Sequence, residues 1–301
     1  MKTPSPVFPK DGCTISFSAG TVRPEATRYR RVSQNSSEKM TELLARFPDL
    51  RSWFSRPPIV VNAYPVSFTP PAKVVFADSY GRWQVLGAGL ALAAQHDLPA
   101  VIISTPLMAA HLLLTLIERQ ISMPSKILLF LGGYYCPNSL ELFLVSLLKT
   151  AGIAATIVHL YGVAEIDAGL LAAKREPHGY EMVFHSIDPD WCPRIENGLL
   201  RFQRTSDTKH DVATDDGATV SGDGIRLSIQ SRRLSHEMYA LLENFTFDDW
   251  HRRTGFLGRP ASGIAIQCRS FIAPKLDQSE VEHFDFCRAY THSWLDKPQW
   301  I

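Results

Sequence analysis

The feature that most constrains the fold is a regular alternation of short apolar runs with helix-forming segments in the first half of the chain. Runs rich in Val, Ile, Leu and Ala recur at residues 59–61, 73–76, 100–103, 126–131 and 154–158. Segments with the composition of buried helices lie between the later runs, at residues 83–95, 107–119 and 138–149. Strands that alternate with helices at this spacing are typical of parallel βαβ units. The sequence therefore predicts an α/β domain with a mostly parallel sheet flanked by helices.

The pattern changes near residue 181. Short apolar runs at residues 182–184, 199–202 and 225–229 are separated by turns rich in Asp, Gly and Asn, which favours antiparallel hairpins. We therefore expect an α/β core over residues 1–180, a smaller antiparallel β-rich part over 181–235, and a short mixed C-terminal tail over 236–301. Residues 203–213 are expected to be mobile.

Charge and cysteine usage exclude several classes of protein. A formal charge of +1 on 301 residues gives no global electrostatic reason to bind nucleic acid or an anionic membrane. The five cysteines are scattered without a Cys-x-x-Cys pair, which favours reduced thiols and a cytoplasmic location. The most membrane-like stretch, residues 98–117, contains Pro106, which would break a spanning helix. We expect a strand followed by a helix there, in a soluble protein without a signal peptide.

Two acidic segments stand out as a candidate site. Residues 159–165 end an apolar run with a predicted Tyr161-Gly162 turn and Glu165, and residues 214–217 form a second predicted turn. In parallel sheets, ligands bind at the loops that leave the carboxyl ends of the strands. One carboxylate could lie near Mg²⁺, which prefers oxygen ligands, and another could accept hydrogen bonds from ribose hydroxyls. The alternative is two ordinary turns in an α/β domain.

The order of these segments resembles the adenylate-forming enzymes, which include acyl-CoA and aryl-CoA ligases, adenylation domains and luciferases. That family carries a phosphate loop, a strand ending in Gly-Gly, a Tyr-Gly-x-x-Glu turn, a Thr-Gly-Asp turn and a downstream Arg, in fixed order. The matching segments here are residues 16–25, 131–135, 161–165, 214–217 and 223–232. The chain is most similar to short members such as phenylacetate-CoA-ligase-like proteins. Most of the family's N-terminal lobe and its usual C-terminal domain have no counterpart.

The resemblance implies a role for each matched residue. Contacts to the phosphates of ATP would come from Ser18, Gly20 and Thr21, and the adenine would be bordered by Gly133, Tyr134 and Tyr135. Tyr161 would also belong to the cofactor-binding residues. Glu165 would bind Mg²⁺, and Asp216 would accept hydrogen bonds from the ribose hydroxyls. Arg232 would contact the ribose or the phosphates, and Glu165 and Arg232 would be the catalytic residues. The pocket for the carboxylic acid would be lined by Thr105, His111 and Gly162.

These roles imply an enzyme that activates a small, aromatic or otherwise apolar carboxylic acid with ATP and Mg²⁺. The acyl-adenylate would pass to CoA, an amine, a carrier protein or a partner enzyme. Departures from the family pattern keep a second hypothesis open: the loop's glycine positions hold Ala19 and Val22, its lysine position holds Glu25, and the adenylation lysine has no evident counterpart. A homologue that binds AMP or a small molecule without turning ATP over would fit these changes.

A third hypothesis is an acyltransferase or condensing enzyme that uses a pre-activated substrate. Cys136 lies just before a predicted helix and could act as its nucleophile if its pKa is low. A packed, inert thiol is the alternative. Because the absent lobe would leave apolar surface exposed, we also expect a homodimer or a partner on that face.

Overall fold

The computed structural model describes residues 14–17, 27–30, 36–64, 74–79, 82–133, 135–163, 166–176, 182–228 and 243–254. The elements up to the middle of the chain are β1 Thr14–Phe17, β2 Thr27–Arg30, α1 Ser36–Arg46, the 3₁₀ helix η1 Pro48–Trp53, β3 Ile59–Asn62, β4 Val75–Asp78, α2 Trp83–Gln95, β5 Ala100–Ser104, α3 Pro106–Glu118, β6 Lys126–Leu131 and α4 Asn138–Thr150. They are followed by β7 Ala154–Val163, β8 Asp167–Ala173, β9 His185–Ser186, β10 Trp191–Glu196, β11 Leu199–Arg204, β12 Asp211–Ser221, β13 Gly224–Leu227 and α6 Phe247–Thr254.

The largest sheet formed by the described strands has the order β4-β3-β5-β6-β7-β8-β9. Neighbours from β4 to β7 are parallel, and β8 and β9 extend the sheet in antiparallel pairing. All of β3 is buried, as is β6 after its first residue, which is the pattern of strands covered on both faces. The predicted α/β class with a mostly parallel sheet is confirmed.

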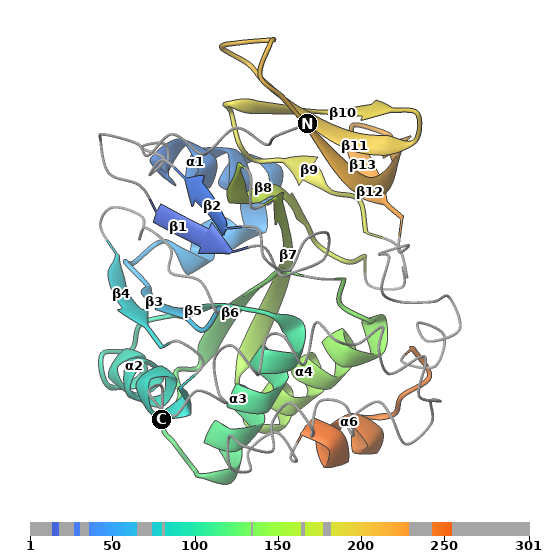
Figure 1. Cartoon of the computed structure of the whole chain (residues 1–301). Helices are drawn as coiled ribbons and strands as arrows, with labels where there is room; N and C mark the ends of the chain where they lie inside the picture. The colour runs from blue at the N-terminus through green and yellow to red at the C-terminus, as the bar shows by residue number, and fades with distance from the viewer. Residues whose placement is uncertain are drawn as a thin grey trace.

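Helices cover both faces of this sheet (Figure 1). Strand residues such as Ile102 and Leu129 pack with α2, α3 and α4 in one core cluster. The alternate residues, such as Val101 and Leu128, pack with α1 and η1 on the opposite face. The two-residue period of each strand therefore divides one apolar run between two helical layers.

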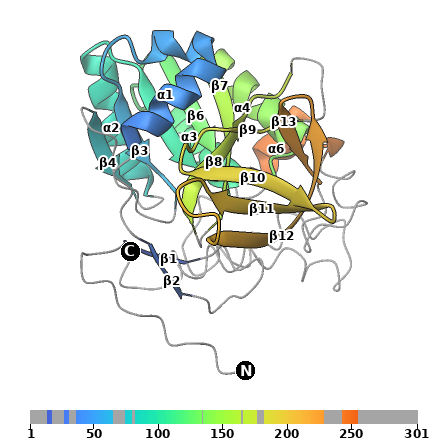
Figure 2. The ribbon, with the colours of Figure 1, turned by 90° about the horizontal axis from the view of Figure 1, so that it is seen from above.

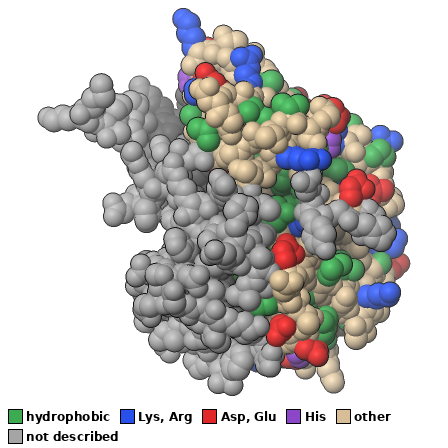
Figure 3. Space-filling view, turned by 90° about the vertical axis from the view of Figure 1, so that its right-hand side faces the viewer, with side chains coloured by type: hydrophobic (Ala, Val, Ile, Leu, Met, Phe, Trp, Pro, Cys, Tyr) green, Lys and Arg blue, Asp and Glu red, His purple; other side chains and the backbone are tan. Residues whose placement is uncertain are grey.

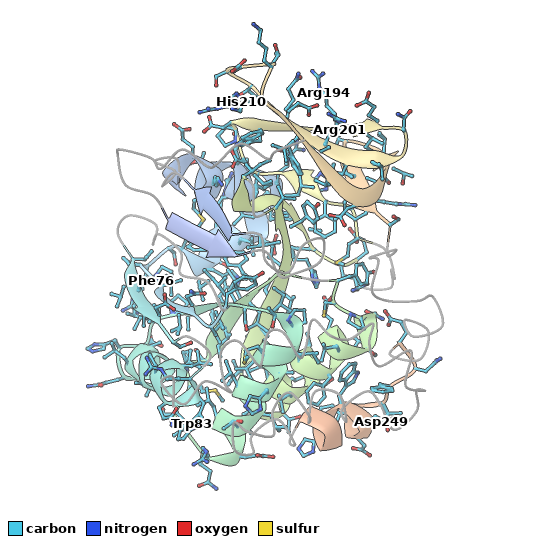
Figure 4. All side chains as sticks on the ribbon, in the orientation of Figure 1. Phe76, Trp83, Arg194, Arg201, His210 and Asp249 are labelled. Atoms are coloured by element: carbon cyan, nitrogen blue, oxygen red, sulfur yellow. The ribbon has the colours of Figure 1, made fainter. Side chains whose placement is uncertain are left out.

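A second, four-stranded antiparallel sheet has the order β10-β11-β12-β13. It lies beside β8 and β9 (Figure 2), and Phe202 and Leu200 on its inner face share a third core cluster with Leu171 of β8. Its outer face carries Arg194 and Arg201, which point away from the large sheet (Figure 4). The predicted antiparallel β-rich part is thus present. The region boundaries at residues 180 and 235 stay a prediction, since β9 lies after residue 181 yet belongs to the large sheet.

Two predicted turns are strands instead. β7 continues through Tyr161 and Gly162 because β8 pairs with it, with Leu171 opposite Tyr161 and a shift in register before Val163. Residues 214–217 lie within β12, and the predicted mobile segment 203–213 includes the end of β11 and the start of β12. Hydrogen bonding to partner strands, which the local sequence does not reveal, extends both strands.

The membrane-like stretch forms β5 and most of α3, as predicted, and within the described part of the chain no helix is long and apolar enough to cross a bilayer. Figure 3 shows that the described surface on one side mixes acidic and basic side chains. The final described segment packs against the helical layer: the carboxylate of Glu243 accepts hydrogen bonds from the backbone N–H groups of Asn138 and Ser139, at 2.8 and 3.2 Å. Glu243 therefore caps the N-terminus of α4.

Candidate functional site

The order of the strands in the large sheet places a topological switch point between β3 and β5. From β3 the chain runs outward to β4 and then returns to β5 on the other side of β3, so the direction of strand addition reverses between these two neighbours. In open α/β sheets, ligands bind outside the carboxyl ends of the strands at such a switch point. Polar side chains collect there: Asn62 ends β3, Ser104 ends β5 and Thr105 follows it, and all three are buried.

The hydroxyl of Ser104 has no hydrogen-bond partner among the described residues, although it is fully buried. A buried hydroxyl without a partner carries a desolvation cost, so it marks a position where a ligand or water would be stabilising. Thr105 is the N-cap of α3, and its side chain makes no capping hydrogen bond. His111, the other side chain predicted for the acid pocket, lies further into α3, about 9 Å along the helix axis from Thr105.

The Gly-Gly segment approaches the same position from β6. Gly133 has φ of +93°, a backbone conformation that glycine adopts readily and other residues rarely do. A Cβ atom at Gly133 would lie 2.8 Å from the Tyr64 hydroxyl and 3.3 Å from the Thr105 methyl group. Gly133 and Thr105, which were predicted separately, are therefore neighbours, and the ends of β3, β5 and β6 meet around them.

A hydrogen bond between the two sheets joins two further predicted residues. The Tyr161 hydroxyl donates to Asp216 Oδ2 at 2.5 Å. The Tyr161 ring stacks on Phe202, with centroids 6.2 Å apart and planes at 18°, and it meets Phe184 edge-on at 6.4 Å. Aromatic contacts on two sides thus hold the phenol toward the carboxylate. Gly162, the next predicted residue, is exposed in β7.

An irregularity in β12 places Asp216 opposite Tyr161. Leu199 pairs with Gly217 and Arg201 with Ala213, so β12 has more residues than β11 between these two pairs. The Thr214 hydroxyl donates to the Leu200 carbonyl at 2.7 Å and accepts from the Asp216 N–H at 3.2 Å, which replaces the missing ladder bonds. Such bulges re-aim side chains, and this one directs Asp216 to the junction of the two sheets.

A buried ionic network, missed by sequence reasoning, lies behind the Gly-Gly segment. Glu141 Oε2 accepts hydrogen bonds from His159 Nε2 at 2.8 Å and from Arg175 Nε at 2.7 Å. Arg175 also donates to the Cys136 carbonyl at 2.7 Å and to the Tyr135 hydroxyl at 3.3 Å. Burial alone would raise the pKa of Glu141, but the hydrogen bonds and charges of His159 and Arg175 outweigh it and lower that pKa. The network is therefore an ionised carboxylate between two donors.

The thiol of Cys136 does not have the environment of a nucleophile. The side chain is fully buried, and burial, followed by the nearby carboxylate of Glu141, raises the pKa of the thiol well above its ordinary value. Reactive cysteines have a lowered pKa and an accessible sulfur. The structure therefore favours the packed thiol over the acyl-accepting one.

The remaining predicted site residues lie outside the described part of the chain: Ser18, Gly20, Thr21, Tyr134, Glu165 and Arg232. The first three belong to the segment that connects β1 to β2, which pair as an antiparallel hairpin. Among the described residues no group of three or more His, Cys, Asp and Glu side chains is arranged to hold a metal ion. The Mg²⁺ site at Glu165 stays a prediction.

The fold of the chain is similar to part of several solved structures, of which it covers between 48% and 61% of the length. E. coli MenE with bound OSB-AMS matches with 13% identity over 74% of this chain and 48% of that one, at a TM-score of 0.46. An acyl-CoA synthetase (AMP-forming)/AMP-acid ligase II-like protein from Dyadobacter fermentans matches with 13% identity over 74% of this chain and 61% of that one, at a TM-score of 0.43. The anthranilate CoA ligase AuaEII, in complex with anthranoyl-AMP, matches with 12% identity over 76% of this chain and 51% of that one, at a TM-score of 0.48. No family model matches the sequence, and a search of curated proteins finds no match.

Proposed function

We propose that the protein activates a small carboxylic acid with ATP. An oxygen of the carboxylate attacks the α-phosphorus, the bond to the β-phosphate breaks, and an acyl-adenylate and pyrophosphate result. The acyl group then passes to a nucleophile such as CoA, a carrier protein or a group on a partner enzyme. An aromatic or otherwise apolar acid is the substrate class proposed.

The observation that carries this proposal is the Tyr161–Asp216 hydrogen bond at 2.5 Å. This bond joins Tyr161 of the segment 161–165 to Asp216 of the segment 214–217, and the two residues lie in different sheets. The resemblance implies that both segments contact the same nucleotide. Only Oδ2 of Asp216 takes part in that bond. The other oxygen of the carboxylate is the proposed acceptor for the ribose hydroxyls, and bonds of this charge-assisted kind are strong and directional.

Other residues are proposed to contact the base, the acid and Mg²⁺. The exposed backbone of Gly133 is the proposed contact for the base, while its missing Cβ leaves room for Tyr64 and Thr105. Thr105 and Ser104 lie at the switch point, where polar groups can orient the acid; the Ser104 hydroxyl has no hydrogen-bond partner among the described residues. Glu165 is the proposed Mg²⁺ ligand, and bound Mg²⁺ would neutralise charge on the phosphates.

Exchange of labelled pyrophosphate into ATP, with a panel of aromatic and aliphatic acids, tests the proposal. Wild-type protein is expected to show exchange with at least one acid, and Asp216→Ala is expected to lower it by about tenfold or more, because a charged hydrogen-bond acceptor is lost. Asp211→Ala, in the same strand but on the outer side beside Arg201, is the matched control and should retain activity.

Two results would contradict the proposal in different ways. AMP binding in calorimetry without pyrophosphate exchange would identify the catalytically reduced homologue that the altered residues Ala19, Val22 and Glu25 suggest. Transfer from an acyl thioester without any need for ATP would identify an enzyme that uses a pre-activated substrate.

A further inference from the structure

We propose that Arg175 is a positioning residue that holds Tyr135 against the base of the bound nucleotide and so strengthens nucleotide binding. This inference rests on the proposed function and extends it to a residue outside the motifs. Arg175 lies two residues after the end of β8, far in sequence from the Gly-Gly segment that it contacts.

The guanidinium group holds the segment after Gly133 at several points. It donates to the Cys136 carbonyl at 2.7 Å and to the Tyr135 hydroxyl at 3.3 Å, and its central carbon lies 5.6 Å from the centroid of the Tyr135 ring. A planar guanidinium with several fixed donors can satisfy these contacts together, whereas an ammonium group cannot. The Tyr135 ring is therefore fixed at its hydroxyl, at its face and through the next carbonyl.

Glu141 in turn fixes the guanidinium. Its carboxylate receives the Arg175 Nε–H at 2.7 Å, while His159 Nε2 donates to the same oxygen at 2.8 Å. The side chains of Arg175 and His159 are each only 4% exposed, so rotation of the guanidinium would leave charged groups buried without partners. A chain of contacts thus runs from β7 through α4 and Arg175 to the ring of Tyr135.

The location of Tyr135 suggests that this network serves ligand binding as well as stability. The ring follows Gly133, whose backbone is exposed, and it packs at the edge of the same core cluster as Tyr161, the hydrogen-bond partner of Asp216. A purine that meets Gly133 while its ribose meets Asp216 would lie beside the Tyr135 ring. Stacking between a base and an aromatic ring depends on ring orientation, which the guanidinium determines.

The test is a double-mutant binding cycle in the 301-residue chain, with Arg175→Lys, Tyr135→Ala and the double variant. Calorimetry measures the Kd of AMP and, as a probe that lacks a base, of inorganic tripolyphosphate. Arg175→Lys is expected to weaken AMP binding by about tenfold, the amount associated with one base–aromatic stacking contact. Tripolyphosphate binding should stay within about twofold, the usual limit for independent sites. Arg201→Lys, on the outer face of the small sheet, is the matched control.

The double variant separates positioning from a general loss of structure. In the Tyr135→Ala background, Arg175→Lys should weaken AMP binding by no more than about twofold further, because the ring through which it acts is absent. Equal loss of AMP and tripolyphosphate binding, or full additivity of the two substitutions, would overturn the inference and leave the proposed function standing. Wild-type protein that binds no AMP at all would instead overturn the proposed function, and the inference with it.

Discussion

Removal of the Glu141 carboxylate should destabilise the protein far more than removal of a surface carboxylate. Glu141 Oε2 accepts hydrogen bonds at 2.8 and 2.7 Å from His159 and Arg175, whose side chains are each 4% exposed. Glu141→Ala would leave the guanidinium of Arg175 buried without its counter-charge. Breaking a buried ion pair by deleting one partner costs about 3–5 kcal/mol. Two charge-assisted hydrogen bonds of about 1.5–3 kcal/mol each give a similar figure.

Urea unfolding monitored by tryptophan fluorescence measures this loss as a change in the free energy of unfolding. Glu42→Ala, an exposed position in α1, is the matched control and should change that free energy by no more than about 0.5 kcal/mol. Joint replacement of Glu141 by Leu and Arg175 by Met should recover part of the loss, because no buried charge of that pair is then left alone. A Glu141→Ala variant as stable as the Glu42→Ala control would refute the reasoning.

The pH dependence of the unfolding free energy provides an independent check on the contribution of the Glu141 carboxylate. Burial by itself would raise the pKa of Glu141, yet His159 and Arg175 lower it below the ordinary value. Because the folded-state pKa lies below the unfolded one, the stabilising contribution is fully present above the unfolded pKa of about 4.3 and is lost as pH falls through the folded value. The stability difference between wild type and Glu141→Gln should therefore be largest near neutral pH and narrow in acid. A difference that widens in acid would show that the carboxylate is not the stabilising form.

Two further predictions use pairs of matched residues. Gly133→Ala should be more destabilising than Gly152→Ala, by about 1–3 kcal/mol, because both glycines have positive φ but only at Gly133 would a new Cβ meet other atoms. Urea unfolding of both variants decides this, and equal losses would mean that backbone strain alone matters. Alkylation of the folded protein with iodoacetamide should modify the exposed Cys192 and spare the buried Cys136. Peptide mass spectrometry reads out both sites, and rapid labelling of Cys136 would restore the thiol-nucleophile hypothesis.

The parallel part of the fold could be predicted closely because its signals are local. The helix predicted at residues 83–95 and the strand predicted at 126–131 coincide with α2 and β6. In both, a continuous run of apolar residues is bounded by polar or turn-forming residues, so composition and length decide the element. The strand predicted at 73–76 is displaced toward residue 78, since the boundary there depends on pairing with β3.

The antiparallel part was harder to predict because its strands depend on distant partners. β8 has Gly and Ala at several positions and no strict alternation, and it pairs with the extension of β7 through Tyr161. Residues 214–217 have the composition of a turn, yet the Thr214 hydroxyl bonds to Leu200 and keeps them within β12. A side-chain bond to a neighbouring strand thus overrides turn propensity.

The ionic network of Glu141, His159 and Arg175 is the feature that the sequence indicates least. Glu141, His159 and Arg175 come from a helix, a strand and the segment after another strand, and nothing in their spacing indicates that they meet. One signal was available: His159 lies in an otherwise apolar strand, where a titratable side chain needs a partner. That signal can identify a buried pair, but only the fold reveals which acid completes it.

At the junction between the two sheets, two residues of the candidate site are held by strands. Tyr161 belongs to a strand of the large sheet, and Asp216 belongs to a strand of the small one. Both orientations follow from packing, through Phe202 for the phenol and the Thr214 bonds for the carboxylate. Sites built on strands hold their groups more closely than sites on loops. It follows that movement of one sheet against the other would separate the two groups, so ligand binding at this junction should be coupled to the packing of the third core cluster.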